Sequence, residues 1–319
     1  MTAARVHGLT IDQSAALTRG VTRLSVAIAA ILSLIKAWAW IASGSVAMLA
    51  SLADSSLDLL AALATAFAVR YAAVPPDQEH RYGHGKAEAF ASLLQAGLVF
   101  GSAALVGREA VGRILHPTPV SHTGWGMAVM GVSIILTAGL IFAQSRVLRQ
   151  ANSVAVSGDR AHYAADLASN VIAFAGIGAS ALVGGSLPDA LAGLAVAAWL
   201  LWGAVSVFRS SSTELMDHEL AEESRQEIAA LMTADPAVRD VHQLRTRASG
   251  PYVHIQMHAD LDPTLTLVQA HKVMVAAEKR VLEAFPAADI IIHPDPRGYA
   301  EPHGGAFPEV YEADRQGDS

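Results

Sequence analysis

Two pairs of ligand-type residues lie in or beside apolar parts of the sequence. Asp54 and Asp58 are four residues apart, and so are His162 and Asp166. Residues at this spacing lie on one face of a helix, one turn from each other. Two carboxylates held that close repel each other unless a cation or a proton lies between them. The first pair therefore predicts a site that binds a metal ion or a proton.

Taken together, the two pairs make a complete coordination shell. Three carboxylates and one imidazole supply four oxygen and nitrogen ligands, a set that suits Zn²⁺. The sequence contains no cysteine, so disulfides and thiolate metal sites are excluded. His162 favours zinc and similar ions, because an all-oxygen shell suits manganese or magnesium. The alternative is that His162 and Asp166 are polar residues at a helix end in contact with solvent.

A third group of ligand-type residues lies between the two pairs in the sequence, soon after Asp58. Asp77, His80 and His84 lie in one polar stretch. They could form a compact three-ligand site, or they could belong to a solvated loop. The two histidines have the spacing of a zinc-protease helix, but Arg81 stands where that helix needs a glutamate.

The last third of the chain holds a further set of candidate ligands. They are His242, His254, His258, His271, His293 and Asp295. Histidines from several elements of one small domain can converge on a metal, although surface histidines are also common. Spacing alone leaves both interpretations open.

The composition indicates a membrane protein with a modest soluble part. Of 319 residues, 52% are hydrophobic and 16% are charged, and the mean hydropathy is +0.36. A soluble domain usually carries about 25% charged residues. The net charge of −7 and the absence of a clustered basic stripe argue against nucleic-acid binding. No cleavable signal peptide is apparent, because several more apolar stretches follow the first.

Six apolar stretches are long enough to cross a bilayer, which takes about 20 residues. They are residues 24–45, 46–69, 89–107, 121–145, 167–188 and 190–208. Arginine and lysine gather on one side of this arrangement, and the short loops on the other side have none. The positive-inside rule therefore predicts that both termini are cytoplasmic. Ionisable residues at membrane depth usually mark a pathway or a coupled pair, as we expect for Asp54 and Asp58.

The pattern changes near residue 211. Two helices and three strands are predicted over residues 220–233, 239–248, 252–259, 265–285 and 290–292. The order αββαβ favours a small α+β domain of ferredoxin-like or metallochaperone-like type, with its helices on one face of a sheet. Beyond Pro296 the chain is rich in glycine, proline and acids, which predicts disorder.

The predicted organisation has three parts. Residues 1–210 form a six-helix transmembrane domain, residues 211–296 form a cytoplasmic metal-binding regulatory domain, and residues 297–319 form a disordered tail.

Several motifs match one family over nearly the whole chain. The matching runs are Asp54–Asp58, His80–Glu88, His162–Asp166, Leu244–Arg247, Val268–His271 and Ile291–His293. They fall in the family's order between about residues 15 and 296, which makes the combination specific. The chain resembles the cation diffusion facilitators, and within them the bacterial zinc and iron efflux transporters.

The resemblance implies a role for each group of ligands. The transport site would consist of Asp54, Asp58, His162 and Asp166. A second site near the cytoplasmic face would consist of Asp77, His80 and His84. A binuclear site in the cytoplasmic domain would consist of His242, His258, His271, His293 and Asp295.

The resemblance also implies a homodimer in the bacterial inner membrane that exchanges metal for protons by alternating access. Zn²⁺ is the expected transported and regulatory ion, with Cd²⁺, Fe²⁺ or other divalent metals left open. Lys86 is expected to pair with Asp217 at a hinge between the domains. The sequence departs from the family at His254, where an apolar or aromatic residue is expected, and at Pro294. His303 lies beyond the resemblance.

Two other classes of function fit parts of the pattern. A membrane metal sensor that does not transport would share these ligands, but the two acids inside the second apolar stretch argue against it. A metalloenzyme would need a general base beside the metal and an open coordination position. The four-ligand shell leaves no such vacancy, so we expect no enzymatic activity. Efflux of Fe²⁺ or Cd²⁺ as the main substrate is the remaining alternative.

Overall fold

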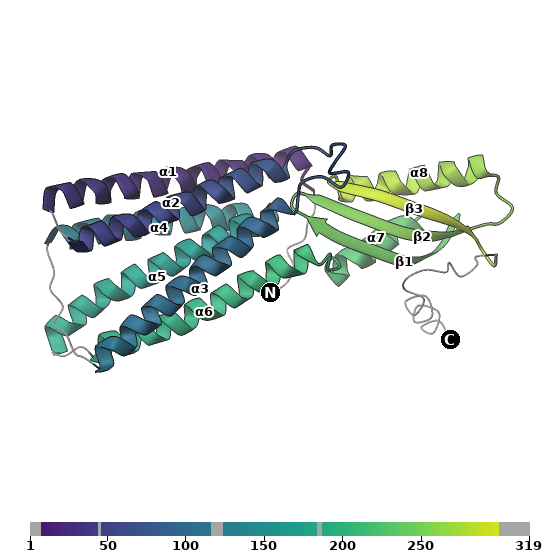
Figure 1. Ribbon diagram of the computed structural model, residues 1–319. Helices are drawn as coiled ribbons and strands as arrows, with labels where there is room; N and C mark the ends of the chain where they lie inside the picture. Colours follow the sequence, from purple (N-terminus) through teal and green to yellow (C-terminus); the bar gives the residue numbers. More distant parts are fainter. Residues whose placement is uncertain (1–7, 44–45, 116–123, 184–186, 300–319) are drawn as a thin grey trace. The chain divides into compact units, whose positions relative to one another are not determined.

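The computed structural model describes residues 8–43, 46–115, 124–183 and 187–299 (Figure 1). The chain divides into two compact units, Ser14–Leu215 and Met216–Ser319, and the second also includes Met1–Gln13. The division falls five residues beyond the boundary expected at residue 210, because the last helix of the first unit continues to Leu215. The expected tail beyond Tyr299 and His303 within it lie outside the described residues.

Six long helices make up the first unit. They are α1 (Ile11–Ser43), α2 (Val46–Ala72), α3 (Ala87–Leu115), α4 (Gly124–Leu148), α5 (Val154–Val183) and α6 (Leu187–Leu215). Within the described residues, all of them except α5 are long and apolar enough to cross a membrane by length and composition. The first half of α5 carries Asp159, Arg160 and Asp166. The prediction of six membrane helices is confirmed.

One predicted boundary differs from the structure in a way that matters for the site. The fifth apolar stretch was expected from residue 167, whereas α5 begins at Val154. His162 and Asp166 therefore lie two to three turns inside a helix, not at its end. The first turns of this helix contain polar residues, so the apolar stretch in the sequence begins later than the helix does.

The outer faces of the helices are apolar, as a bilayer requires. Ile41, Phe67 and Phe142 are each at least two-thirds exposed in the isolated chain. Between the helices the contacts are close: a Cβ atom added to Gly158 would lie 2.9 Å from the Ser92 hydroxyl. Small residues allow helix backbones to approach in this way in membranes. The contact fixes α5 against α3 one turn before His162.

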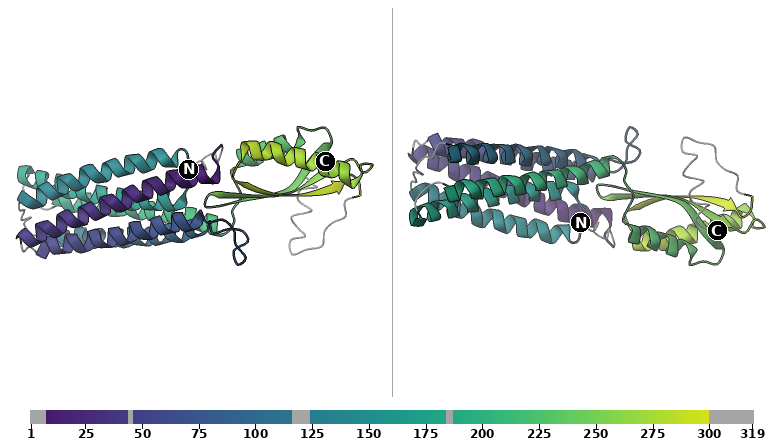
Figure 2. Two further views of the ribbon diagram at one scale, coloured as in Figure 1. Left: turned by 90° about the horizontal axis from the view of Figure 1, so that it is seen from above. Right: turned by 90° about the horizontal axis from the view of Figure 1, so that it is seen from below.

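The second unit has the order αββαβ, as predicted. Its elements are α7 (Glu222–Thr233), β1 (Val238–Ser249), β2 (Tyr252–Leu261), α8 (Leu267–Ala284) and β3 (Ala288–Pro296). The sheet order is β1-β2-β3, with β1 antiparallel and β3 parallel to β2. Both helices lie on the same side of the sheet (Figure 2).

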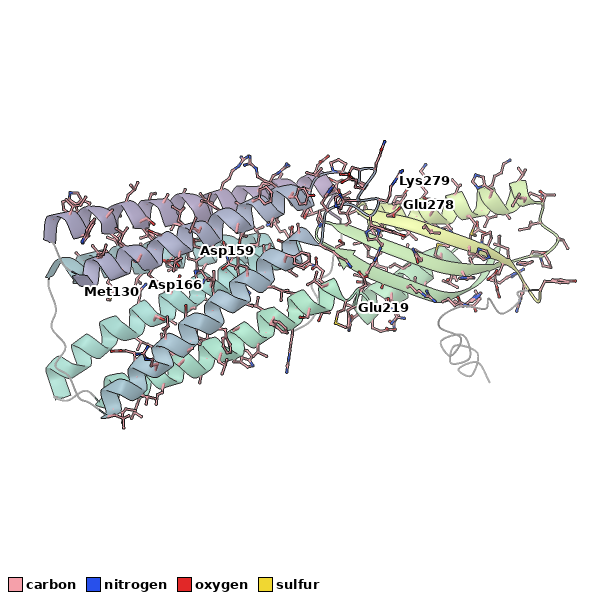
Figure 3. The ribbon with its side chains drawn as sticks, viewed as in Figure 1. Met130, Asp159, Asp166, Glu219, Glu278 and Lys279 are labelled. Carbon is pink, nitrogen blue, oxygen red and sulfur yellow. The ribbon has the colours of Figure 1, made fainter. Side chains whose placement is uncertain are left out.

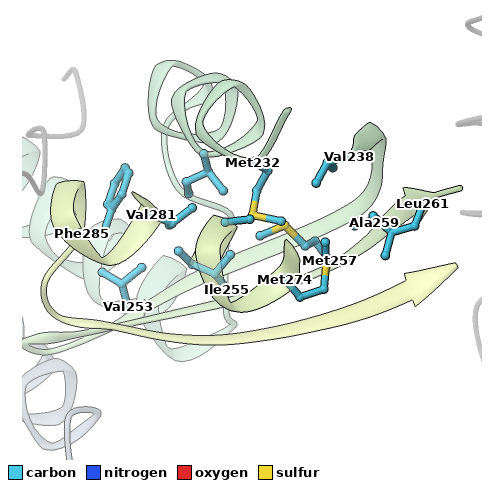
Figure 4. Close-up of a cluster of buried hydrophobic side chains, with 12 residues drawn as sticks. Met232, Val238, Val253, Ile255, Met257, Ala259, Leu261, Met274, Val281 and Phe285 are labelled. Carbon is cyan, nitrogen blue, oxygen red and sulfur yellow. The ribbon is translucent and has the colours of Figure 1, made fainter. Parts of the chain in front are cut away.

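The core of this unit lies between the sheet and the two helices (Figure 4). Val253, Ile255 and Met257 alternate along β2 and are buried against Val281 of α8 and against Phe285, which directly follows that helix. Burial of each such side chain contributes roughly 1.5–3 kcal/mol. Because alternate residues of a strand point to opposite faces, this core directs His258 to the other face of the sheet.

Candidate functional site

Three predicted ligands meet in the interior of the six-helix unit. His162 of α5 lies with Nε2 3.0 Å from Oδ1 of Asp58 on α2 and 3.6 Å from Oδ2 of Asp166. One ligand atom from each of the three residues lies within 4.8 Å of the others. The imidazole is only 4% exposed. Residues more than a hundred positions apart in the sequence thus converge on a volume that a metal ion could occupy.

Asp54 lies one turn before Asp58 on α2 and is more exposed. It does not belong to the groups of described residues whose ligand atoms already lie within reach of one ion. Beside it, the Ser55 hydroxyl accepts a hydrogen bond from Lys36 of α1, and its carbonyl accepts one from Ser33 at 2.9 Å. These bonds hold α2 against α1 next to Asp54.

The arrangement makes a proton and a metal ion mutually exclusive at one atom. The hydrogen bond between His162 Nε2 and Asp58 Oδ1 places a proton between these two atoms. A metal binds only the deprotonated nitrogen, so it must displace this proton. The other ring nitrogen, Nδ1, is buried and has no hydrogen-bond partner among the residues that the structure describes.

A second cluster lies in the turn between α2 and α3. Asp77 Oδ1 lies 3.3 Å from His80 Nδ1, and Asp77 Oδ2 lies 3.2 Å from His84 Nε2. The same carboxylate accepts the backbone N–H groups of His80 and Glu79 at 2.6 and 2.9 Å. The first of these hydrogen bonds is the main cause that lowers the pKa of Asp77. The segment is a turn, which excludes the zinc-protease helix.

A third cluster lies on the open face of the sheet. His242, His258 and His293 are consecutive partners across β1, β2 and β3. Asp295 is buried among them: its Oδ2 lies 2.8 Å from His258 Nδ1 and 3.3 Å from His242 Nε2, and its Oδ1 lies 3.3 Å from His293 Nε2. A carboxylate that bridges with both oxygens could serve two ions.

Comparison with known proteins finds a matching family model for each of the two units. Residues 22–216 match the family model described as the cation efflux transmembrane domain, and residues 220–297 match the cation efflux protein cytoplasmic domain. The chain belongs to the cation efflux family.

Relatives of the same family cover almost the whole chain. The cation-efflux pump FieF of Shewanella oneidensis is 42% identical over 275 residues, 86% of this chain and 93% of that protein. FieF of Citrobacter koseri is 38% identical over 292 residues, 91% and 97% of the two chains. FieF of Klebsiella pneumoniae is 38% identical over 270 residues, 85% and 90%.

Some ligands predicted from the family resemblance are not brought together. His271 is exposed on α8 and belongs to none of the metal-type groups found among the described residues. His254, a departure from the cation efflux pattern, is buried with Nδ1 3.3 Å from Asp289. Burial, followed by the nearby Arg247, lowers the pKa of His254. His242 also lies in a further group with Asp240 and Asp260.

The predicted hinge partners belong to different units. Within the first unit, Lys86 donates a hydrogen bond to the carbonyl of Leu215 at 3.3 Å. Within the second, Asp217 forms an ion pair with Arg247 at 3.0 Å. The pairing of Lys86 with Asp217 stays a prediction.

A buried polar network beside the first cluster was not foreseen from the sequence. Asp159, one turn before His162 on α5 (Figure 3), accepts hydrogen bonds from the amides of Gln95 and Gln144 at 3.2 and 2.8 Å. Gln95 also donates to Thr65 at 2.9 Å, and Gln144 donates to Ser25 at 3.2 Å. The network links one residue from each of the five helices α1, α2, α3, α4 and α5. Glutamines inside uncharged apolar stretches were the available signal.

Glu88 was also missed as a positioning residue. It is buried in the first turn of α3, and Ser153, at the start of α5, donates its hydroxyl proton to the carboxyl group. The hydroxyl oxygen of Ser153 in turn accepts the N–H of Val156 at 3.2 Å. This chain of bonds fixes the beginning of the helix that carries His162.

Proposed function

We propose that this member of the cation efflux family exports divalent metal cations, above all Zn²⁺, from the cytoplasm in exchange for protons. The transport site in this proposal consists of Asp54, Asp58, His162 and Asp166. The observation that carries it is the position of His162 Nε2 between the carboxylates of Asp58 and Asp166, inside the six-helix unit. Ionisable residues at membrane depth usually mark an ion pathway.

Proton exchange follows from the chemistry of these ligands. Metal binding needs a deprotonated imidazole nitrogen and ionised carboxylates, so protons and metal compete for the same atoms. At near-neutral pH the site takes up metal and releases protons. When it faces a more acidic compartment, protonation of His162 and a carboxylate favours metal release.

Zinc is the favoured ion because the site combines oxygen ligands with one imidazole. Imidazole suits zinc and its neighbours, whereas oxygen ligands alone suit magnesium and manganese. Cd²⁺ and Fe²⁺ are secondary candidates on the same argument.

The other clusters extend this proposal. Asp77, His80 and His84 form a second metal site near the cytoplasmic face. The cytoplasmic domain forms a regulatory binuclear zinc site, with ligands His242, His258, His271, His293 and Asp295. The protein acts as a homodimer in the bacterial inner membrane with both termini in the cytoplasm, and Lys86 pairs with Asp217 at the hinge. Metal in the cytoplasmic domain can shift the membrane domain only by binding one of its conformations more tightly.

The test of proton coupling is metal flux in proteoliposomes with an imposed pH gradient. Full-length protein is reconstituted, and movement of Zn²⁺, Cd²⁺, Fe²⁺ and Mn²⁺ is followed with the gradient present and after an ionophore has collapsed it. We expect zinc to move fastest toward the acidic compartment and to slow when the gradient collapses. Flux that is the same with and without the gradient contradicts proton exchange. Absence of any flux favours a non-transporting sensor.

A further inference from the structure

A cavity outside the metal clusters lies among α3, α4, α5 and α6. Its volume is about 280 Å³. Its walls include Arg160, Ser145, Ile141, Trp199, Leu200 and Trp202. One charged group and one hydroxyl therefore face a cavity whose other walls are mainly apolar.

Arg160 is the polar end of this cavity. Its Nη1 donates to the Ser145 hydroxyl at 3.5 Å, the one hydrogen bond recorded for its side chain within the described residues. No carboxylate of those residues forms an ion pair with it. A charged side chain in a membrane-spanning unit is costly unless it is paired or reaches the interface. The guanidinium thus requires an anion or solvent, and a phosphate can satisfy it with two parallel hydrogen bonds.

The apolar part of the cavity consists chiefly of two tryptophans. Trp199 is 48% exposed and Trp202 is 69% exposed, so both present ring surface outward from α6. Both lie near the middle of the 29-residue helix, so their rings are at the depth of the acyl chains. They offer an apolar surface for the acyl chain of a lipid.

The depth of Arg160 fits a lipid headgroup. It lies six residues after the start of α5, which is about 9 Å along the helix axis. A long arginine side chain at that depth reaches the interface. Arg146 in the last turn of α4 adds positive charge at the same end of the bundle, and positive charge beside a membrane attracts anionic lipids.

We propose that this cavity binds a phospholipid with an anionic headgroup, with the phosphate on Arg160 and Ser145 and an acyl chain along Trp199 and Trp202. Charge complementarity favours a lipid over a second copy of the chain, because a lipid supplies both the anion and the apolar chain. The assignment does not depend on the proposed metal export, and lipid binding is measured independently of flux.

The test is native mass spectrometry of the delipidated full-length protein in detergent. Phosphatidylglycerol and phosphatidylcholine with identical acyl chains are added separately. We expect the wild type to retain phosphatidylglycerol preferentially, and Arg160→Gln to weaken that binding by roughly tenfold or more, since it removes a charge-assisted bidentate contact. Arg149→Gln removes an exposed arginine outside the cavity and should bind like the wild type.

Three results would overturn the proposal. They are unchanged phosphatidylglycerol binding by Arg160→Gln, equal loss in Arg149→Gln, and binding of inorganic phosphate that is as tight as that of the lipid. Arg160→Gln should fold, because it removes an uncompensated charge. Quenching of wild-type tryptophan fluorescence by brominated phosphatidylglycerol gives a second measurement. Quenching that persists unchanged in Trp199→Phe/Trp202→Phe places the lipid elsewhere.

Discussion

At the scale of single residues, the proposed metal binding and the proposed proton exchange both depend on one nitrogen atom of the candidate transport site. His162 Nε2 lies 3.0 Å from Asp58 and 3.6 Å from Asp166, where either a proton or a metal ion can satisfy the two carboxylates. The spacing of the two residue pairs predicted this cluster, because residues four apart share a helix face. The distance across the helices could not be predicted from spacing, since it depends on how α2 and α5 pack.

The residues that support His162 escaped prediction for a related reason. Asp159, Gln95 and Gln144 come from different helices, and a glutamine in an apolar stretch does not by itself show which group it contacts. Only packing shows that they share hydrogen bonds. His271 is the reverse case, because the family resemblance assigns it to the cytoplasmic site but it is exposed on α8.

We predict that His162→Asp weakens the preference of the transport site for zinc over manganese. The substitution replaces the imidazole, which favours zinc, by a carboxylate, so that all four ligands are oxygen ligands. A tenfold loss of preference corresponds to about 1.4 kcal/mol. Competitive binding titrations of the full-length protein measure the ratio of the two affinities. His218→Asp, which changes an exposed histidine outside the clusters, is the matched control. An unchanged ratio in His162→Asp would show that the imidazole does not set selectivity.

At the scale of elements, the beginning of α5 decides where the site lies. The sequence predicted the helices and strands of the second unit within a few residues, because alternation in strands and the stop at Pro286 are local signals. It misplaced the start of α5, whose first turns are polar. Those turns are stabilised by tertiary contacts, namely Glu88 with Ser153 and the close approach of Gly158 to Ser92.

We predict that Glu88→Ala destabilises the membrane unit by about 1–3 kcal/mol, because Ser153 is left without its buried acceptor. The carboxyl group also accepts the N–H of Ala155, so the first turn of α5 loses two bonds. Thermal unfolding of the detergent-solubilised protein measures the effect as a lowered midpoint. Glu79→Ala, which removes an exposed glutamate side chain from the adjoining turn, should leave the midpoint unchanged. Equal midpoints for both variants would rule out this role for Glu88.

At the scale of the whole molecule, two units with different solvents carry different kinds of site. The membrane unit holds its candidate ligands on helix faces, where side chains from distant parts of the chain meet. The second unit holds its candidate ligands in a row across a sheet, with His242, His258 and His293 in register and Asp295 buried among them. Both clusters are built on regular secondary structure. Residue spacing predicted the first cluster, and the family resemblance predicted the second.

The most direct test of the account is zinc flux by full-length protein carrying Asp58→Asn. Asparagine keeps the size of the side chain but loses the charge that faces His162. We predict that Zn²⁺ transport in proteoliposomes falls by more than the roughly 10- to 100-fold that loss of an outer-shell partner costs a metal site. Glu223→Gln, an exposed acid on α7, should transport like the wild type. Wild-type flux through Asp58→Asn would contradict the central claim that metal passes through this cluster.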